Sequence, residues 1–218
     1  MGRIRVLVVD DHIIVRQGLI SLLVDADEIE IVGEADNGAA AVEAVDGLRP
    51  DVVLMDIVMP EMDGAQATAT ICARWPGSRI LILSGSNVRS RILMALRAGA
   101  LGYISKTSPR NELVEAVQRT HQGLPVMPRD MTSKFLETYP AAAPNPETLT
   151  RRETEILKLL AQGLTNQGIA EHAGISEATI RTHVGNIFGK LGINNRVEAT
   201  LCALRDGLTT LDESLGLA

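Results

Sequence analysis

Residues 4–11 read IRVLVVDD, an apolar run rich in β-branched residues that ends abruptly in two acids. Four more short apolar runs follow, and a longer segment with helical spacing separates each run from the next. Strands of this kind, each followed by a helix, predict an α/β domain with a five-stranded, doubly wound parallel sheet. The expected strands span Ile4–Val9, Ile29–Val32, Val52–Met55, Ile80–Leu83 and Gly102–Ile104.

The segments after these runs are expected to form helices that cover both faces of the sheet. In the last of them, Ser108 is expected to be the N-cap and Pro109 the first helical residue. The five helices are expected at Ile13–Leu23, Ala39–Leu48, Ala65–Ala73, Ser90–Ala98 and Pro109–Gln122.

Polar side chains stand at the carboxyl ends of four expected strands, and ligands of open α/β sheets bind at that edge. Asp10 and Asp11 follow the first strand, Asp56 the third, Ser84 the fourth and Lys106 the fifth. The three carboxylates repel one another, and a single ammonium cannot neutralise all of them, so a bound metal cation is expected. Carboxylate oxygens are ligands that suit Mg²⁺. With the ion bound, one carboxylate can attack a phosphoryl group while the ammonium and the hydroxyl stabilise its oxygens. The pattern therefore predicts an aspartyl phosphate.

Over its whole length this half of the chain resembles the receiver domain of response regulators, which has a flavodoxin-like fold. The resemblance implies that Asp56 is the phosphoacceptor, with Lys106 and Ser84 beside the phosphoryl group. It also implies a Mg²⁺ site in which Asp11 is a direct ligand, Asp10 lies beside it, and Asp56 and the backbone carbonyl of Val58 complete the protein ligands. The matching strings are VVDDH at 8–12, LMDIVMPEMDG at 54–64, ILS at 82–84 and GALGYISK at 99–106.

The same resemblance makes Ser84 and Tyr103 a switch pair. In that scheme the Ser84 hydroxyl moves toward the phosphoryl oxygens and Tyr103 turns inward into the space it leaves.

The aspartyl phosphate is expected to be comparatively long-lived, because its hydrolysis needs a water held in line behind the phosphorus. The side chains two residues beyond Asp56 and Ser84 are Val58 and Ser86, and neither can orient an attacking water as a charged side chain could.

A connector at 125–148 is expected to separate this domain, at 1–124, from a second domain at 149–218. Residues 123–146 contain five of the nine prolines of the chain, which is typical of a domain boundary. Within the connector, Met131–Thr138 is expected to form a short linker helix.

The second domain is expected to be a small all-α unit of four helices that contains a helix-turn-helix. Thr150 and Glu153 form the sequence signature of a capping box at the start of the first helix, which ends at Gly163. The second helix follows Thr165, and the third follows Ser176 and carries an apolar stripe that points Arg181, Thr182, Gly185 and Gly189 away from the core.

About sixty residues of this domain resemble the LuxR-type DNA-binding domain, so the whole chain resembles NarL/FixJ-type response regulators. The resemblance places the third helix in the major groove, with Arg181, Thr182 and Gly185 at base edges and Thr179 and Lys190 near phosphates. Gly185 departs from the longer polar side chain of many relatives, so one arm that could read bases is missing. The matching strings are LTRRE at 149–153, AQGLTN at 161–166, ISEATIRTHV at 175–184 and KLG at 190–192.

A fourth helix after Asn194 is expected to carry apolar residues with the rhythm of a helix-pairing seam. The resemblance makes this seam the dimer contact, and the alternative is that it only packs against the first helix of its own domain. The seam consists of Val197, Leu201, Leu204, Leu208 and, at its end, Leu211.

Composition limits the remaining classes of protein. With 45% hydrophobic and 22% charged residues, the composition excludes disordered and collagenous chains. The net charge is −6, and neither expected domain has an excess of basic residues. No apolar run approaches the length of a spanning helix, so a cytoplasmic protein without a membrane partner is expected. Cys72 and Cys202 have neither metal nor redox spacing and are expected to be free thiols.

The expected function is that of a DNA-binding response regulator of a two-component system, not a turnover enzyme, with Mg²⁺ as cofactor. Its expected partners are a sensor histidine kinase, double-stranded DNA with an inverted repeat, a second copy of the active chain, and RNA polymerase. Two alternatives stay open. One is a phosphohydrolase with an aspartyl-phosphate intermediate, although no substrate-binding cap is visible, and the other is a protein-interaction regulator with weak or lost DNA readout.

Overall fold

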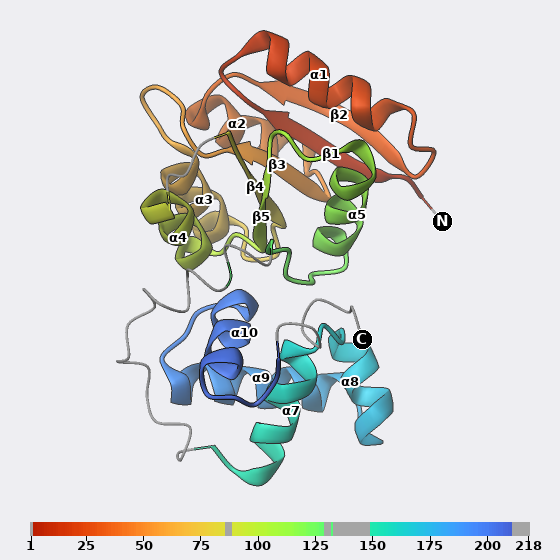
Figure 1. Ribbon diagram of the computed structural model, residues 1–218, viewed down its shortest axis with the longest axis vertical. Coiled ribbons are helices and arrows are strands. Elements are labelled where there is room, and N and C mark those ends of the chain that lie inside the picture. The colour runs from red at the N-terminus through yellow and green to blue at the C-terminus, as the bar shows by residue number, and fades with distance from the viewer. Residues whose placement is uncertain (1, 86–88, 129–131, 133–148, 211–218) are drawn as a thin grey trace. The chain divides into compact units, whose positions relative to one another are not determined.

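A five-stranded parallel sheet forms the first of two units in this computed structural model, which describes residues 2–85, 89–128, 132 and 149–210 (Figure 1). The strand order is β2-β1-β3-β4-β5, so the chain reverses its winding direction between β1 and β3. The register sets Val9 beside Met55 and Asp56 beside Leu83, which aligns the ends of the central strands. The strands are β1 (Ile4–Val9), β2 (Ile29–Ala35), β3 (Val52–Asp56), β4 (Ile80–Ser84) and β5 (Gly102–Ser105).

Five helices cover the sheet, with α1 and α5 on one face and α2, α3 and α4 on the other (Figure 1). On the first face, Leu19 and Leu23 of α1 and Leu113 and Val117 of α5 pack against residues of the strands in one buried cluster. The expected α/β fold is confirmed. The helices are α1 (Ile13–Val24), α2 (Gly38–Leu48), α3 (Gly64–Arg74), α4 (Arg89–Ala98) and α5 (Arg110–His121).

The start of α5 differs from the expectation. Its N-cap is Pro109, which has an extended backbone and makes no hydrogen bond from its side chain, so Ser108 is not the cap and Pro109 is not inside the helix. A proline side chain offers no acceptor, and α5 therefore begins without the side-chain cap that Asn37 provides for α2 and Asp63 for α3.

The first unit extends past the expected limit of its domain. Val126 accepts a hydrogen bond from the amide of Tyr103 at 2.8 Å and donates one to the carbonyl of Leu101 at 3.0 Å, so it pairs with the edge of the sheet. This approach requires a glycine at the start of β5, because a Cβ at Gly102 would lie 2.0 Å from the carbonyl oxygen of Val126.

Four helices form the core of the second unit among the residues described, as the sequence predicts: α7 (Arg151–Ala161), α8 (Asn166–Ala173), α9 (Glu177–Leu191) and α10 (Arg196–Arg205). Thr150 and Glu153 form the expected capping box, and Thr165 and Ser176 cap α8 and α9. Buried side chains from all four helices form one cluster, which includes Ile156, Ile169, Ile180 and Cys202.

Helix α10 is shorter than the apolar rhythm indicates. It ends at Arg205, and Gly207 then adopts a left-handed backbone with φ of 67°. Leu208 therefore does not continue the helical face of Val197 and Leu201, and it packs against the core of the second unit. Leu211 lies outside the described residues, as does the expected linker helix apart from Thr132.

No helix among the residues that the structure describes is both long enough and apolar enough to span a membrane.

Candidate functional site

Lys106 joins two of the acids at the carboxyl edge of the sheet. Its Nζ lies 2.6 Å from Oδ2 of Asp10 and 2.8 Å from Oδ2 of Asp56. Asp10 follows β1, Asp56 ends β3 and Lys106 follows β5, so three strands bring one ion-paired group together. Asp10 is fully buried and Asp56 is 3% exposed. Buried carboxylates are strongly destabilising unless they are paired, and Lys106 supplies the pairing charge for both.

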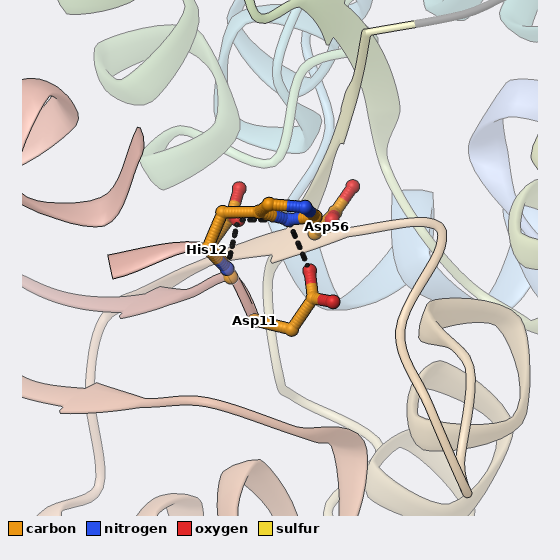
Figure 2. Close-up of side chains that lie close together, drawn as sticks. Asp11, His12 and Asp56 are labelled. Carbon is orange, nitrogen blue, oxygen red and sulfur yellow. Dashed lines mark hydrogen bonds and ion pairs between the residues drawn. The ribbon is translucent and has the colours of Figure 1, made fainter. Parts of the chain in front are cut away.

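Asp11 and His12 complete the acidic cluster. The Nδ1 atom of His12 lies 2.7 Å from Oδ1 of Asp11, and the His12 amide donates a hydrogen bond to Oδ1 of Asp10 at 2.9 Å. Figure 2 shows a ring nitrogen of His12 directed toward the Asp11 carboxylate. Ligand atoms of Asp10, Asp11, His12 and Asp56 all lie within 4.8 Å of one another.

The donor set of this cluster fits a hard divalent cation. Asp10, Asp11 and Asp56 contribute three carboxylates, and Lys106 neutralises only one of their charges. Carboxylate oxygens are the ligands that Mg²⁺ prefers. The imidazole of His12 is a poorer ligand for Mg²⁺, and its observed bond is to Asp11.

Burial and pairing act in opposite directions on the two central groups. Burial raises the pKa of Asp56, and the hydrogen bond and charge of Lys106 reduce that rise. For Lys106, burial lowers the pKa, but the hydrogen bonds to Asp10 and Asp56 outweigh it, so the pKa is higher than usual. The ammonium is therefore held in its charged form beside the Asp56 carboxylate.

Two more of the predicted residues, Ser84 and Val58, lie next to Asp56. Ser84 ends β4 next to it and is buried, and the Val58 amide donates to Oδ1 of Asp56 at 3.4 Å. Tyr103 lies in β5 and is buried. Val58 itself is 41% exposed. Ser86 lies outside the described residues.

The sequence analysis missed Arg16, which reaches the site from α1. Its Nη1 donates to the backbone carbonyl of Asp10 at 2.7 Å, and its Nε donates to Oε2 of Glu34 at 2.9 Å. The available signal was its place on α1, one turn after His12. Its partner Glu34 lies 18 residues away on β2, and no local pattern indicates that contact.

The residues predicted to face DNA lie on the exposed side of α9. Thr179, Arg181, Thr182, Gly185 and Lys190 are all exposed, while the apolar stripe of the same helix is buried or half-buried. Arg181 donates to Oε1 of Glu177 at 2.6 Å along the helix surface. A side chain at Gly185 would meet no described atom within 4 Å, so this part of the surface is bare backbone.

Lys190 has a second role that the sequence analysis did not predict. Its Nζ lies 2.6 Å from Oε2 of Glu153, which also accepts hydrogen bonds from the amide and hydroxyl of Thr150. These contacts lower the pKa of Glu153 to about 2, chiefly through the hydrogen bond from Lys190. The pair connects the end of α9 to the start of α7. Arg196 adds another polar connection, since it donates to the carbonyls of Leu160 and Leu164.

Two family models match the chain. The response regulator receiver domain matches residues 6–118, and the model of bacterial regulatory proteins of the luxR family matches residues 147–203. Each match lies within one of the two units, and together the matches contain the acidic cluster and the α9 surface.

Curated relatives match over nearly the full chain. The transcriptional regulatory protein LiaR of Bacillus subtilis (strain 168) is 38% identical over 208 residues, which cover 94% of this chain and 99% of LiaR. The response regulator protein VraR of Staphylococcus aureus (strain NCTC 8325 / PS 47) is 38% identical over 205 residues, which cover 94% of this chain and 98% of VraR.

Solved structures show the same similarity. The response regulator ChrA of a heme-sensing two-component system aligns with a TM-score of 0.54 at 38% identity, covering 96% of this chain and all of ChrA (100%). A structure of two RcsB dimers bound to two parallel DNAs aligns with a TM-score of 0.56 at 26% identity, covering 95% of this chain and 100% of the RcsB chain.

Proposed function

The chain belongs to the response regulators that join a receiver domain to a LuxR-type DNA-binding domain, and we propose that phosphorylation of Asp56 controls its binding to DNA. The observation that carries the proposal is the position of Lys106 between Asp10 and Asp56. A cation held beside a buried carboxylate can neutralise the phosphoryl oxygens that arrive there.

In the proposed reaction an Asp56 oxygen attacks the phosphorus of a phosphohistidine on a sensor kinase. The new oxygen–phosphorus bond forms as the phosphorus–nitrogen bond breaks, and the imidazole leaves. Lys106 stabilises the charge on the phosphoryl oxygens, and Ser84, which ends the neighbouring strand, donates to one of them. Mg²⁺ bound by Asp10, Asp11, Asp56 and the carbonyl of Val58 would neutralise further charge on the phosphoryl group when present.

When Asp56 is phosphorylated, Ser84 and Tyr103 move, and their movement alters the face formed by α4, β5 and α5. The chain then hydrolyses its own aspartyl phosphate slowly and turns over no external substrate. The active form binds an inverted repeat as a dimer and acts on RNA polymerase. Among the described residues of the apolar seam, Leu204 is half-buried and accessible to a partner in the proposed dimer, whereas Val197 and Leu201 are buried and Leu208 packs against the core of its own unit.

Phosphoryl uptake tests the receiver half of this proposal. Acetyl phosphate and Mg²⁺ should phosphorylate the parent chain, and Asp56→Asn should remove the uptake because an amide is a poor nucleophile. Asp36→Asn is the matched control, since Asp36 is an exposed acid that directly follows β2. Undiminished uptake by Asp56→Asn would place the phosphoacceptor elsewhere.

A salt titration of binding to specific and random DNA tests the output half. Counterion release gives a negative slope of log affinity against log salt, whereas the alternative of a protein-interaction regulator that does not bind DNA predicts no such slope. Arg181→Ala should cost about 1 to 3 kcal/mol on the best site if Arg181 reads a guanine, and Lys190→Ala should weaken all sequences about equally. Lys158→Ala on the exposed surface of α7 controls for the loss of one charge.

A further inference from the structure

Arg16 connects the acidic site to the neighbouring strand. Its side chain is only 13% exposed, and its guanidinium donates both to the Asp10 carbonyl and to the carboxylate of Glu34 on β2. Gln17 donates to the same Glu34 oxygen at 3.1 Å, which further fixes that carboxylate. The planar guanidinium can hold two acceptors at once in a defined geometry, which a single ammonium cannot do.

The carbonyl that Arg16 holds belongs to the peptide group between Asp10 and Asp11. The other polar groups of Asp10 are also engaged: its amide donates to Ala35, and its two carboxylate oxygens contact the His12 amide and Lys106. Fixing this peptide group fixes the direction in which the chain leaves β1 and therefore the Cα position of Asp11.

The positive charge of Arg16 does not favour metal binding at the acidic cluster. The carboxylate of Glu34 lies 2.9 Å from Nε of Arg16 and compensates its charge. Any net positive charge left on Arg16 would repel a metal ion held by the neighbouring acids. A role through charge and a role through geometry thus predict opposite effects when Arg16 is removed.

We propose that Arg16, anchored by Glu34, is a positioning residue that holds the Asp10–Asp11 peptide in the geometry required for Mg²⁺ binding. This inference rests on the proposed function, because it needs the acidic cluster to be the metal site. Polar groups that orient metal ligands in this way commonly change metal affinity by about 10- to 100-fold when removed.

The test is a titration of the full chain with Mn²⁺ in which the electron paramagnetic resonance signal of the free ion measures how much metal is unbound. Arg16→Ala should bind Mn²⁺ about 10-fold more weakly than the parent. Arg5→Ala is the matched control and should bind like the parent, because Arg5 also donates to a backbone carbonyl, that of Arg49, at the opposite end of β1. Equal or tighter binding by Arg16→Ala would overturn the inference.

Two further variants separate this result from folding defects and from failure of the metal site. Arg16→Lys keeps the charge and is the variant to use if Arg16→Ala does not fold by circular dichroism. It should also bind more weakly than the parent, and parent-like binding would overturn the inference. Asp11→Ala should abolish binding at the site. If the parent binds no Mn²⁺, or if Asp11→Ala binds as the parent does, the proposed metal site is wrong and this inference is wrong with it.

Discussion

Val58 places an apolar and partly exposed side chain two residues beyond the proposed phosphoacceptor. A side chain in this place could orient the water that attacks the phosphorus, but a valine cannot. Val58→Asn should therefore shorten the lifetime of the phosphorylated chain by roughly 3- to 10-fold, or about 0.7 to 1.4 kcal/mol of barrier. The decay of the phosphorylated protein on phosphate-affinity gels measures it. Val58→Ala should leave the lifetime unchanged, and an unchanged or slower decay in Val58→Asn would contradict the prediction.

Gly64 supports the site through its lack of a side chain. A Cβ at Gly64 would lie 2.1 Å from the backbone carbonyl oxygen of Asp56, so α3 could not begin where it does without moving β3. We expect Gly64→Ala to destabilise the receiver by about 1 to 3 kcal/mol and to slow phosphoryl uptake. Urea unfolding and acetyl phosphate uptake measure the two effects.

Gly47 is the matched control for this substitution. It lies in α2, where a Cβ would meet no described atom within 4 Å, so Gly47→Ala should be neutral or stabilise by up to about 1 kcal/mol. Equal effects of the two substitutions would show that close packing at Gly64 is not the cause.

At the scale of elements, the start of α7 and the end of α9 are joined by Glu153 and Lys190. The pKa of Glu153 is lowered from 4.5 to about 2 in the folded chain. The charged form of Glu153 therefore stabilises the folded second unit fully above the unfolded pKa of about 4.5. This stabilisation is lost as the pH falls from about 4.5 to about 2.

Thermal unfolding of the second unit, measured from neutral pH down to about pH 2, tests the pair. Glu153→Gln should be less stable than the parent at neutral pH, by about 1 to 3 kcal/mol, because a charge-assisted bond in a buried place is lost. The difference should shrink as the pH falls. Glu155→Gln is the control, because Glu155 is exposed and pairs only along the surface of α7 with Arg152 among the described contacts. A constant difference between parent and Glu153→Gln would refute the pairing.

In the part of the chain that the structure describes, each of the two units has buried hydrophobic side chains packed in a core of its own. A ligand that binds only the folded receiver stabilises that unit, by about 2.7 kcal/mol at a concentration 100 times its dissociation constant. We therefore expect Mg²⁺ with a phosphodonor to raise the unfolding temperature of the first unit more than that of the second.

The single tryptophan makes this measurable. Trp75 lies in the first unit, just after α3 and under the guanidinium of Arg49, so its fluorescence reports receiver unfolding, whereas the far-ultraviolet circular dichroism reports both units. Asp11→Ala should remove the shift in the fluorescence transition. A shift that persists in this variant would show that the ligand acts elsewhere.

The sequence alone determines the elements and the residue types at the edge of the sheet. Buried strands and capped helices leave local signatures, such as the run at 4–9 or the box of Thr150 and Glu153, because each depends on neighbours within a few residues. The order of elements then places Asp10, Asp56 and Lys106 at one edge by topology alone.

Only the tertiary structure decides which polar groups meet across elements. Arg16 with Glu34, Lys190 with Glu153, and Arg196 with the end of α7 join residues that are 18 to 37 positions apart. The end of α10 at Arg205 was also decided there, because Leu208 packs against the core rather than on the helical face that its spacing indicates. Such contacts leave no periodic pattern in the chain, since they arise from the packing of whole elements and not from the preferences of neighbouring residues.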